Sequence, residues 1–229
     1  MVTAKKTPIF VGMLFIVGTL SGVLSVVVTK SLLENADYLV VIAANGTRII
    51  IGSIFIVIMG ISLAMVPVLL FPLLKKQNEV LAIGALVFRG VLEAVMYVII
   101  AVKMLFLYSI SQRYIQALPP ESLYLKSLAD LLQAADIYLM NLLGIVFFIG
   151  ALMIYYLLYQ SKLIPRWLSA WGFLGGIPYF VASLSGMFGL EIEVFLFPLA
   201  AQEMIMALWL IVKGFDENAI TGLSANDVL

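Results

Sequence analysis

The chain has 229 residues, of which 64% are hydrophobic and 11% charged, with 13 basic and 13 acidic side chains. Soluble domains carry roughly 45–50% apolar and about 25% charged residues, so this composition excludes a water-soluble fold, and the absence of a basic tail or patch argues against a nucleic-acid partner. The chain contains no cysteine and no histidine, which excludes disulfides, thiolate catalysis, Ser-His-Asp triads and the usual zinc sites, and we expect no cofactor and no metal.

Long apolar runs follow one another along the whole chain. In lipid, only helices and closed barrels satisfy their backbone polar groups, and these runs lack the alternation of barrel strands. Each is close to or above the about 20 residues that a spanning helix needs. They predict an all-α, polytopic transmembrane bundle in one domain over residues 1–229. The expected spans are residues 9–28, 49–74, 80–108, 137–159, 167–188 and 194–212, followed by a short, frayed polar tail over 213–229.

Basic residues near the ends of the spans predict the orientation, because cytoplasmic flanks are enriched in lysine and arginine. With a cytoplasmic N-terminus, seven basic residues lie inside and four outside. The inner set is Lys5, Lys6, Lys75, Lys76, Lys162, Arg166 and Lys213, and the outer set is Lys30, Arg48, Arg113 and Lys126. We therefore expect a plasma-membrane protein with both termini in the cytoplasm.

The second long outer connection, from Ser109 to Asp136, carries helix signals of its own. Pro119 and Pro120 precede Glu121, as at a helix start, and leucines then recur at helical spacing over residues 125–135. This pattern predicts an amphipathic helix that lies on the outer surface or extends into the fourth span. It is either a cap packed on the bundle or a lid that gates a substrate.

Four ionisable residues fall within the expected spans: Arg89, Glu93, Lys103 and Glu203. A charge at the bilayer centre costs roughly 2.5–3.5 kcal/mol on insertion scales, so such residues need partners. Lys103 is close to the outer end of its span, and we expect its amine to reach the interface.

The other three form one expected cluster. Arg89 and Glu93 are four residues apart and share a helix face. Arg89 and Glu203 each lie about 14 Å from the inner end of their spans, at 1.5 Å per residue. We therefore expect Arg89 to bridge Glu93 and Glu203. One cation facing two carboxylates favours proton uptake by one acid, as in a proton-coupled transporter, whereas a structural hydrogen-bonded cluster has the same composition.

The order of the spans gives a further hint of transport. Three spans precede the Ser109–Asp136 connection and three follow it, and the third helix of each half carries a midplane acid, Glu93 or Glu203. Inverted repeats around a midplane site are a transporter architecture. The sequence similarity between the halves is too faint to define a repeat.

Three segments resemble a known family. They are Phe88-Arg89-Gly90-Val91-Leu92-Glu93-Ala94, Ser161 to Leu168 (SKLIPRWL), and the end of the sixth span with Gln202-Glu203 and Trp209 to Phe215 (WLIVKGF). In this order they are similar to the bacterial family called "domain of unknown function 4386", and the resemblance covers nearly the whole chain. It implies a six-span bacterial membrane protein and implies no reaction.

Three kinds of function therefore stay open. The first is a transporter-like or regulatory membrane protein in which Arg89, Glu93 and Glu203 form a substrate or proton site. The second is a structural or partner-binding protein in which the cluster only fixes helix packing. A lipid-modifying enzyme is less favoured, because the chain has no histidine, no cysteine and no aspartate-rich metal motif. The expected partners are membrane lipids and a small solute or proton, and no catalytic residue is assigned.

Overall fold

The computed structural model describes residues 6–190 and 192–225, and in them the chain is helical apart from short turns. Six helices are long and apolar enough to cross a membrane, which confirms the expected all-α transmembrane bundle. The elements are α1 (Thr7–Leu33), α2 (Tyr38–Ala44), α3 (Gly46–Leu74), α4 (Glu79–Ala85), η1 (Leu86–Leu92), α5 (Glu93–Tyr114), α6 (Glu121–Ser161), α7 (Arg166–Gly186), η2 (Glu193–Leu196), α8 (Phe197–Val212) and α9 (Glu217–Ala225). The third spanning helix is the continuous run of α4, η1 and α5.

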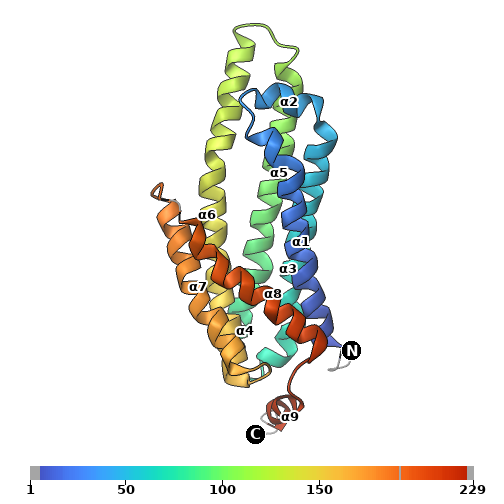
Figure 1. Cartoon of the computed structure of the whole chain (residues 1–229), viewed down its shortest axis with the longest axis vertical. Coiled ribbons are helices and arrows are strands. Elements are labelled where there is room, and N and C mark those ends of the chain that lie inside the picture. The colour runs from blue at the N-terminus through green and yellow to red at the C-terminus, as the bar shows by residue number, and fades with distance from the viewer. Residues whose placement is uncertain (1–5, 191, 226–229) are drawn as a thin grey trace.

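The six spanning helices close into a ring, because α1 packs on α3, α3 on α5, α5 on α6, α6 on α7, α7 on α8, and α8 returns to α1. Figure 1 shows this bundle along its length, with α8 crossing it obliquely. The outer faces carry apolar side chains such as Val27 and Ile61, which are 67% and 61% exposed. Exposed apolar side chains suit a surface that contacts lipid. Polar and charged side chains in the spans are therefore expected to face the interior of the ring.

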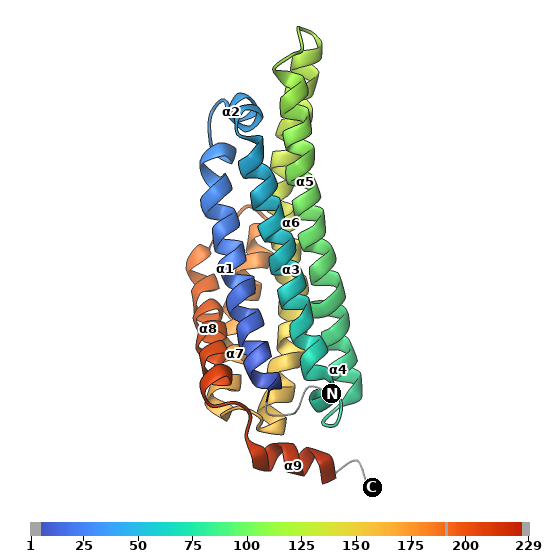
Figure 2. The same ribbon diagram turned by 90° about the vertical axis from the view of Figure 1, so that its right-hand side faces the viewer.

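The amphipathic segment expected in the second long connection is continuous with the fourth span. Helix α6 has 41 residues, about 60 Å at 1.5 Å per residue, which is twice the roughly 30 Å hydrocarbon core of a bilayer. In Figures 1 and 2, α5 and α6 rise together beyond the other spanning helices. We call this end of the bundle the hairpin end.

Helix α2 packs on the projecting α5–α6 pair as a cap. The Tyr38 hydroxyl donates to Oδ1 of Asp130 at 2.6 Å, and the side-chain amides of Gln112 and Gln133 donate to Ala43 O at 2.7 Å and Leu33 O at 3.2 Å. Burial and the neighbouring Asp130 carboxylate raise the pKa of the Tyr38 hydroxyl well above its usual range. These contacts tie the connection between the first two spans, Thr29 to Arg48, to the Ser109–Asp136 connection.

The opposite end carries the start of α1 and the end of α8, and we call it the terminal end (Figure 2). The segment expected as a frayed tail differs from that expectation, because it contains α9, which lies across the terminal end with Leu223 4% exposed. The preceding Phe215 is also buried, at 8% exposure. Two apolar side chains thus hold a segment that its overall polarity had suggested would be loose. The expected tail beyond residue 225 and the N-terminal residues 1–5 lie outside the described residues.

Candidate functional site

Arg89 lies in a stretch of π-helix, η1, that interrupts the third spanning helix. A π-turn adds a residue to the helical turn and displaces side chains from their regular α-helical positions, and such segments are frequent at functional sites. The neighbouring α6 comes very close here, because a Cβ on Gly150 would lie 2.8 Å from the Arg89 backbone nitrogen. Only glycine permits this approach, so Gly150 sets the depth at which Arg89 enters the ring.

The Arg89 guanidinium bridges two carboxylates from different helices. Its Nη1 donates to Glu93, with Nη1–Oε2 at 3.2 Å and Nη1–Oε1 at 3.4 Å, and its Nη2 donates to Oε1 of Glu203 at 2.8 Å. The contact predicted from shared depth is therefore confirmed. Glu93 begins α5 and Glu203 lies in α8, which is not a neighbour of α5 in the ring, so the interaction crosses the ring interior.

Two tyrosines and two phenylalanines complete the surroundings of this cluster. The Tyr97 hydroxyl donates to Oε1 of Glu93 at 3.4 Å, and the Tyr155 hydroxyl donates to Oε1 of Glu203 at 3.3 Å. The guanidinium carbon lies 4.2 Å from the ring centroid of Phe147 and 5.7 Å from that of Phe15. Aromatic faces attract cations, most strongly when water is excluded, so these rings stabilise Arg89 at 1% exposure.

The two carboxylates are not equivalent. The Glu93 side chain is 1% exposed and that of Glu203 13%. Both oxygens of Glu93 receive an Arg89 contact, whereas both donors that reach Glu203 converge on Oε1. Among the described residues, no donor reaches Oε2 of Glu203. Glu203 is thus the member of the cluster with an open acceptor position.

Lys103 has a partner that the sequence did not predict. Its side chain is 10% exposed and pairs with Asp136 of α6, whose side chain is 36% exposed. That the amine lies at the membrane interface stays a prediction. The sequence did not identify Asp136 as a partner of Lys103. Asp136 lies just before the fourth apolar run, where the sequence indicates only the end of the connection that precedes it.

A cavity of about 380 Å³ lies between α6, α7 and the segment that leads into α8. Asp136, Asn141, Tyr179 and Ser183 supply its polar lining, and the remaining wall is apolar. Its volume is within the range of roughly 300–1,000 Å³ of small-molecule sites. The Asn141 amide nitrogen and the Ser183 hydroxyl donate to their own helix backbones, so they offer oxygen acceptors to a ligand.

Aromatic rings connect this cavity to the charged cluster. Tyr179 lines the cavity, and its ring centroid lies 4.9 Å from that of Phe147. Phe147 in turn covers the Arg89 guanidinium. A cavity beside the middle of α6 is therefore separated from the intramembrane cluster by two aromatic side chains.

Sequence reasoning brought together Arg89, Glu93 and Glu203 but missed their neutral partners. Tyr97, Tyr155, Phe147 and Phe15 belong to long apolar runs in which many aromatic residues face lipid. The one available signal was the spacing of Tyr97, one turn after Glu93. Over residues 6–190 and 192–225, no three acidic side chains come close enough together to hold a metal ion.

Comparison with known proteins identifies the family of this chain but assigns it no activity. No curated protein and no solved structure matches the chain. The family described as "Domain of unknown function (DUF4386)" matches residues 10–214, which includes every spanning helix except the first residues of α1. The chain therefore belongs to the DUF4386 family.

Proposed function

We propose that this protein is a transporter-like membrane protein in which Glu203, with Arg89 and Glu93, binds a proton during the movement of a small solute. The observation that carries the proposal is the imbalance of the buried cluster: one guanidinium faces two carboxylates, and Oε2 of Glu203 has an open acceptor position. Two ionised acids would leave a net negative charge in a low-dielectric interior, which favours taking up a proton.

The cavity supports the solute part of the proposal. It offers the Asp136 carboxylate, whose Oδ1 is paired with Lys103, together with amide and hydroxyl oxygens in an apolar wall. Acceptor groups of this kind suit a small solute with N–H donors and an apolar body, such as a protonated amine. The Tyr179–Phe147 pair would then act as the gate between solute and proton site, because it is the direct link between them.

The orientation and membrane are part of the same proposal. The terminal end carries Lys6, Lys75, Lys162, Arg166 and Lys213, and this basic bias favours the cytoplasmic side of a bacterial plasma membrane. The cavity would then face the outside.

The competing function is a scaffold or partner-binding role. The hydrogen bonds of Tyr97 and Tyr155 and the rings of Phe147 and Phe15 complete the cluster as a packing element would. In that case the charges fix the register of α5 and α8 and nothing moves through the ring.

The deciding experiment asks whether Glu203 exchanges a proton. Infrared difference spectra of purified protein between acid and alkaline pH report the carbonyl band of protonated carboxylic acids. Wild type should show a buried-acid band that Glu203→Gln lacks, while Glu34→Gln, which changes an exposed acid that is 66% exposed, should keep it. Identical spectra for wild type and Glu203→Gln would refute the proton site.

Transport is tested in liposomes that contain a pH-sensitive dye. Small amines also cross a bilayer as neutral free bases and take up a proton inside, so protein-free liposomes give the baseline rate. With an imposed inside-negative potential, small primary and secondary amines added outside should change the internal pH faster than this baseline with wild type and at the baseline rate with Glu203→Gln. If Glu203 exchanges a proton and yet both proteins give the same pH trace with every amine, the solute class is wrong while the proton site stands.

A further inference from the structure

A second cavity, of about 430 Å³, lies at the terminal end. Its walls are the α6–α7 connection, the start of α7, the end of α8 and the linker to α9. The linker is fixed in place, because the backbone N–H of Asp216 donates to Leu163 O at 3.0 Å. Leu163, Ile164 and Phe215 are buried and form part of these walls.

Three cations line this cavity: Lys162, Arg166 and Lys213. Among the described residues, no carboxylate pairs with any of them, and the guanidinium of Arg166 lies 5.2 Å from the ring centroid of Tyr159. The single acid in the wall, Asp216, already accepts the backbone N–H of Ala219 at 2.9 Å. The three cations therefore outnumber the one carboxylate in the wall, and the cavity has a surplus of positive charge.

The backbone of Lys162 is in the left-handed region, with φ of 58°. This position follows the end of α6 and is where glycine or asparagine normally stands. A lysine there is conformationally unfavourable, since its Cβ crowds the backbone. The presence of a cationic side chain at a position that favours glycine points to a use for the charge.

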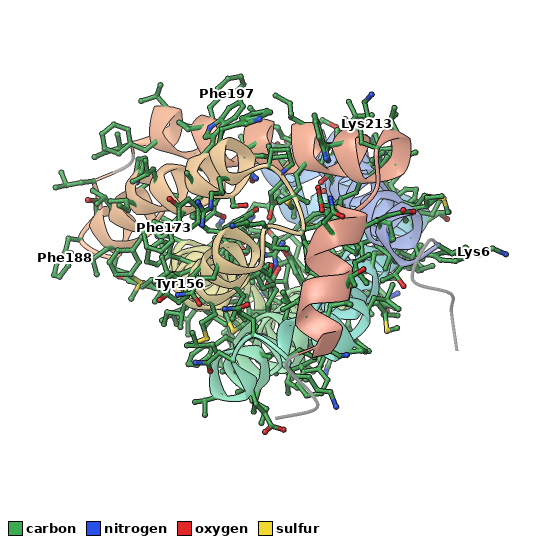
Figure 3. The ribbon with its side chains drawn as sticks, turned by 90° about the horizontal axis from the view of Figure 1, so that it is seen from below. Lys6, Tyr156, Phe173, Phe188, Phe197 and Lys213 are labelled. Atoms are coloured by element: carbon green, nitrogen blue, oxygen red, sulfur yellow. The ribbon has the colours of Figure 1, made fainter. Side chains whose placement is uncertain are left out.

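Tryptophans place the cavity at the membrane surface. Trp209 is in its wall, and the ring centroid of Trp167 lies 6.4 Å from those of both Trp209 and Trp171. Tryptophan is enriched at the headgroup level of bilayers. The backbone N–H groups of the first turn of α7 are also oriented toward this end and favour an anion. Figure 3 looks onto this end and shows Lys213 where α8 gives way to α9.

We propose that this cavity binds the phosphate group of an anionic membrane lipid, with Lys162, Arg166 and Lys213 as its ligands. Basic pockets between spanning helices are suited to such headgroups. A free phosphate would satisfy the same three cations, but the tryptophans beside them favour a ligand with an apolar body. The inference does not depend on the function of the charged cluster.

Native mass spectrometry with defined lipids tests the proposal. Wild type should retain phosphatidylglycerol in preference to phosphatidylcholine, and Lys162→Gln/Arg166→Gln/Lys213→Gln should lose this preference by on the order of 100-fold. The matched control is Lys6→Gln/Lys75→Gln/Lys76→Gln, which removes three cations from the same end but none from the cavity wall. It should bind as wild type does.

Lys162→Gly separates binding from folding. Glycine suits the left-handed backbone, so this variant should unfold at the same temperature as wild type or higher, while its lipid preference falls by about fivefold. Equal lipid preference in wild type and the triple cavity variant would overturn the proposal, as would an equal loss in the control. Stabilisation by inorganic phosphate, with no preference among lipids, would show a soluble phosphate site and overturn the lipid assignment.

Discussion

Arg89 and Glu203 are separated by 114 positions in the chain, yet Nη2 of the arginine lies 2.8 Å from Oε1 of the glutamate. Arg89 lies in η1 of the third spanning helix and Glu203 in α8. Because these two spanning helices are not neighbours in the ring, the contact connects them across its interior. It also connects the two halves of the chain, so its loss affects the whole bundle.

Removing Arg89 should destabilise the protein strongly. Arg89→Ala leaves Glu93 and Glu203 buried without a cation, and breaking a buried ion pair in this way typically costs about 3–5 kcal/mol. Thermal unfolding in detergent measures the effect. Arg113→Ala is the matched control, because Arg113 is 72% exposed and its pair with Glu121 spans 3.5 Å at the surface, where such pairs contribute about 0–1 kcal/mol. Equal losses in the two variants would contradict the bridging role.

Gly150→Ala should also destabilise the protein, by about 1–3 kcal/mol. The added methyl group would lie 2.8 Å from the Arg89 backbone nitrogen and 2.9 Å from its Cβ, so α6 and η1 must move apart. Gly90→Ala is the control, since its Cβ would meet Pro67 at an ordinary 3.6 Å and alanine favours helix by up to about 1 kcal/mol over glycine. A stable Gly150→Ala protein with unchanged thermal midpoint would show that the two helices are less tightly packed than their geometry requires.

The fold was largely predictable because lipid restricts it. In lipid, backbone N–H and C=O groups must form their hydrogen bonds within the protein, so a long apolar run forms a helix. The ends of the runs near Leu74 and Val212 therefore coincide with the ends of α3 and α8. The polar connections were harder. The Ser109–Asp136 segment is mostly helix, because α5 and α6 support each other beyond the level where α7 ends. Such support depends on tertiary packing, which hydropathy does not report.

The charged cluster was predictable for a different reason. A buried charge must find a partner, and helix geometry converts sequence position into depth, so Arg89, Glu93 and Glu203 could be placed at one level. The uncharged residues around the cluster could not be predicted in this way. In the sequence, Phe147 and Tyr155 look the same as aromatic residues that face lipid, because the sequence does not report which way a side chain points. The π-helix η1 also changes the direction in which the Arg89 side chain points.

The Lys103–Asp136 pair should respond asymmetrically to substitution. The lysine side chain is 10% exposed and that of the aspartate 36%, so removing the acid leaves the more buried charge alone. Asp136→Ala should therefore cost more than Lys103→Ala, with both in the range of about 1–3 kcal/mol. Thermal unfolding of both variants and of the double variant measures the pair. A larger loss of stability in Lys103→Ala than in Asp136→Ala would contradict this prediction. It would mean that the unpaired Asp136 carboxylate is destabilised more than its exposure indicates.

Single cysteines test the orientation, because the chain contains none of its own. Glu79, at the start of α4, is exposed at the terminal end, and Tyr124 is 69% exposed at the hairpin end. In intact cells, an impermeant thiol reagent should label Tyr124→Cys and leave Glu79→Cys unlabelled until the membrane is opened. The reverse pattern would place the terminal end outside and would contradict the basic-residue argument.

Tyr38 should make the stability of the hairpin end depend on alkaline pH. Its hydroxyl donates to Asp130, and Tyr114 and the carboxylate lie close enough to oppose a negative charge on it, with Lys126 5.6 Å above its ring. The pKa of Tyr38 is thereby raised in the folded state above the usual tyrosine value of about 10. Above pH 10 the unfolded chain releases this proton and the folded chain keeps it.

The sign follows from the protons bound in each state. When the unfolded state binds fewer protons, stability falls as pH rises. The Tyr38 contribution is therefore fully present below about pH 10 and is lost between that value and the higher folded pKa. Tyr38→Phe should be less stable at pH 7 by about 1 kcal/mol, the usual net contribution of a hydrogen bond, and its difference from wild type should shrink above pH 10. Tyr124→Phe, an exposed tyrosine at the same end, should follow wild type throughout. A constant difference between wild type and Tyr38→Phe from pH 7 to 11 would show that the Tyr38 hydroxyl does not titrate differently on folding.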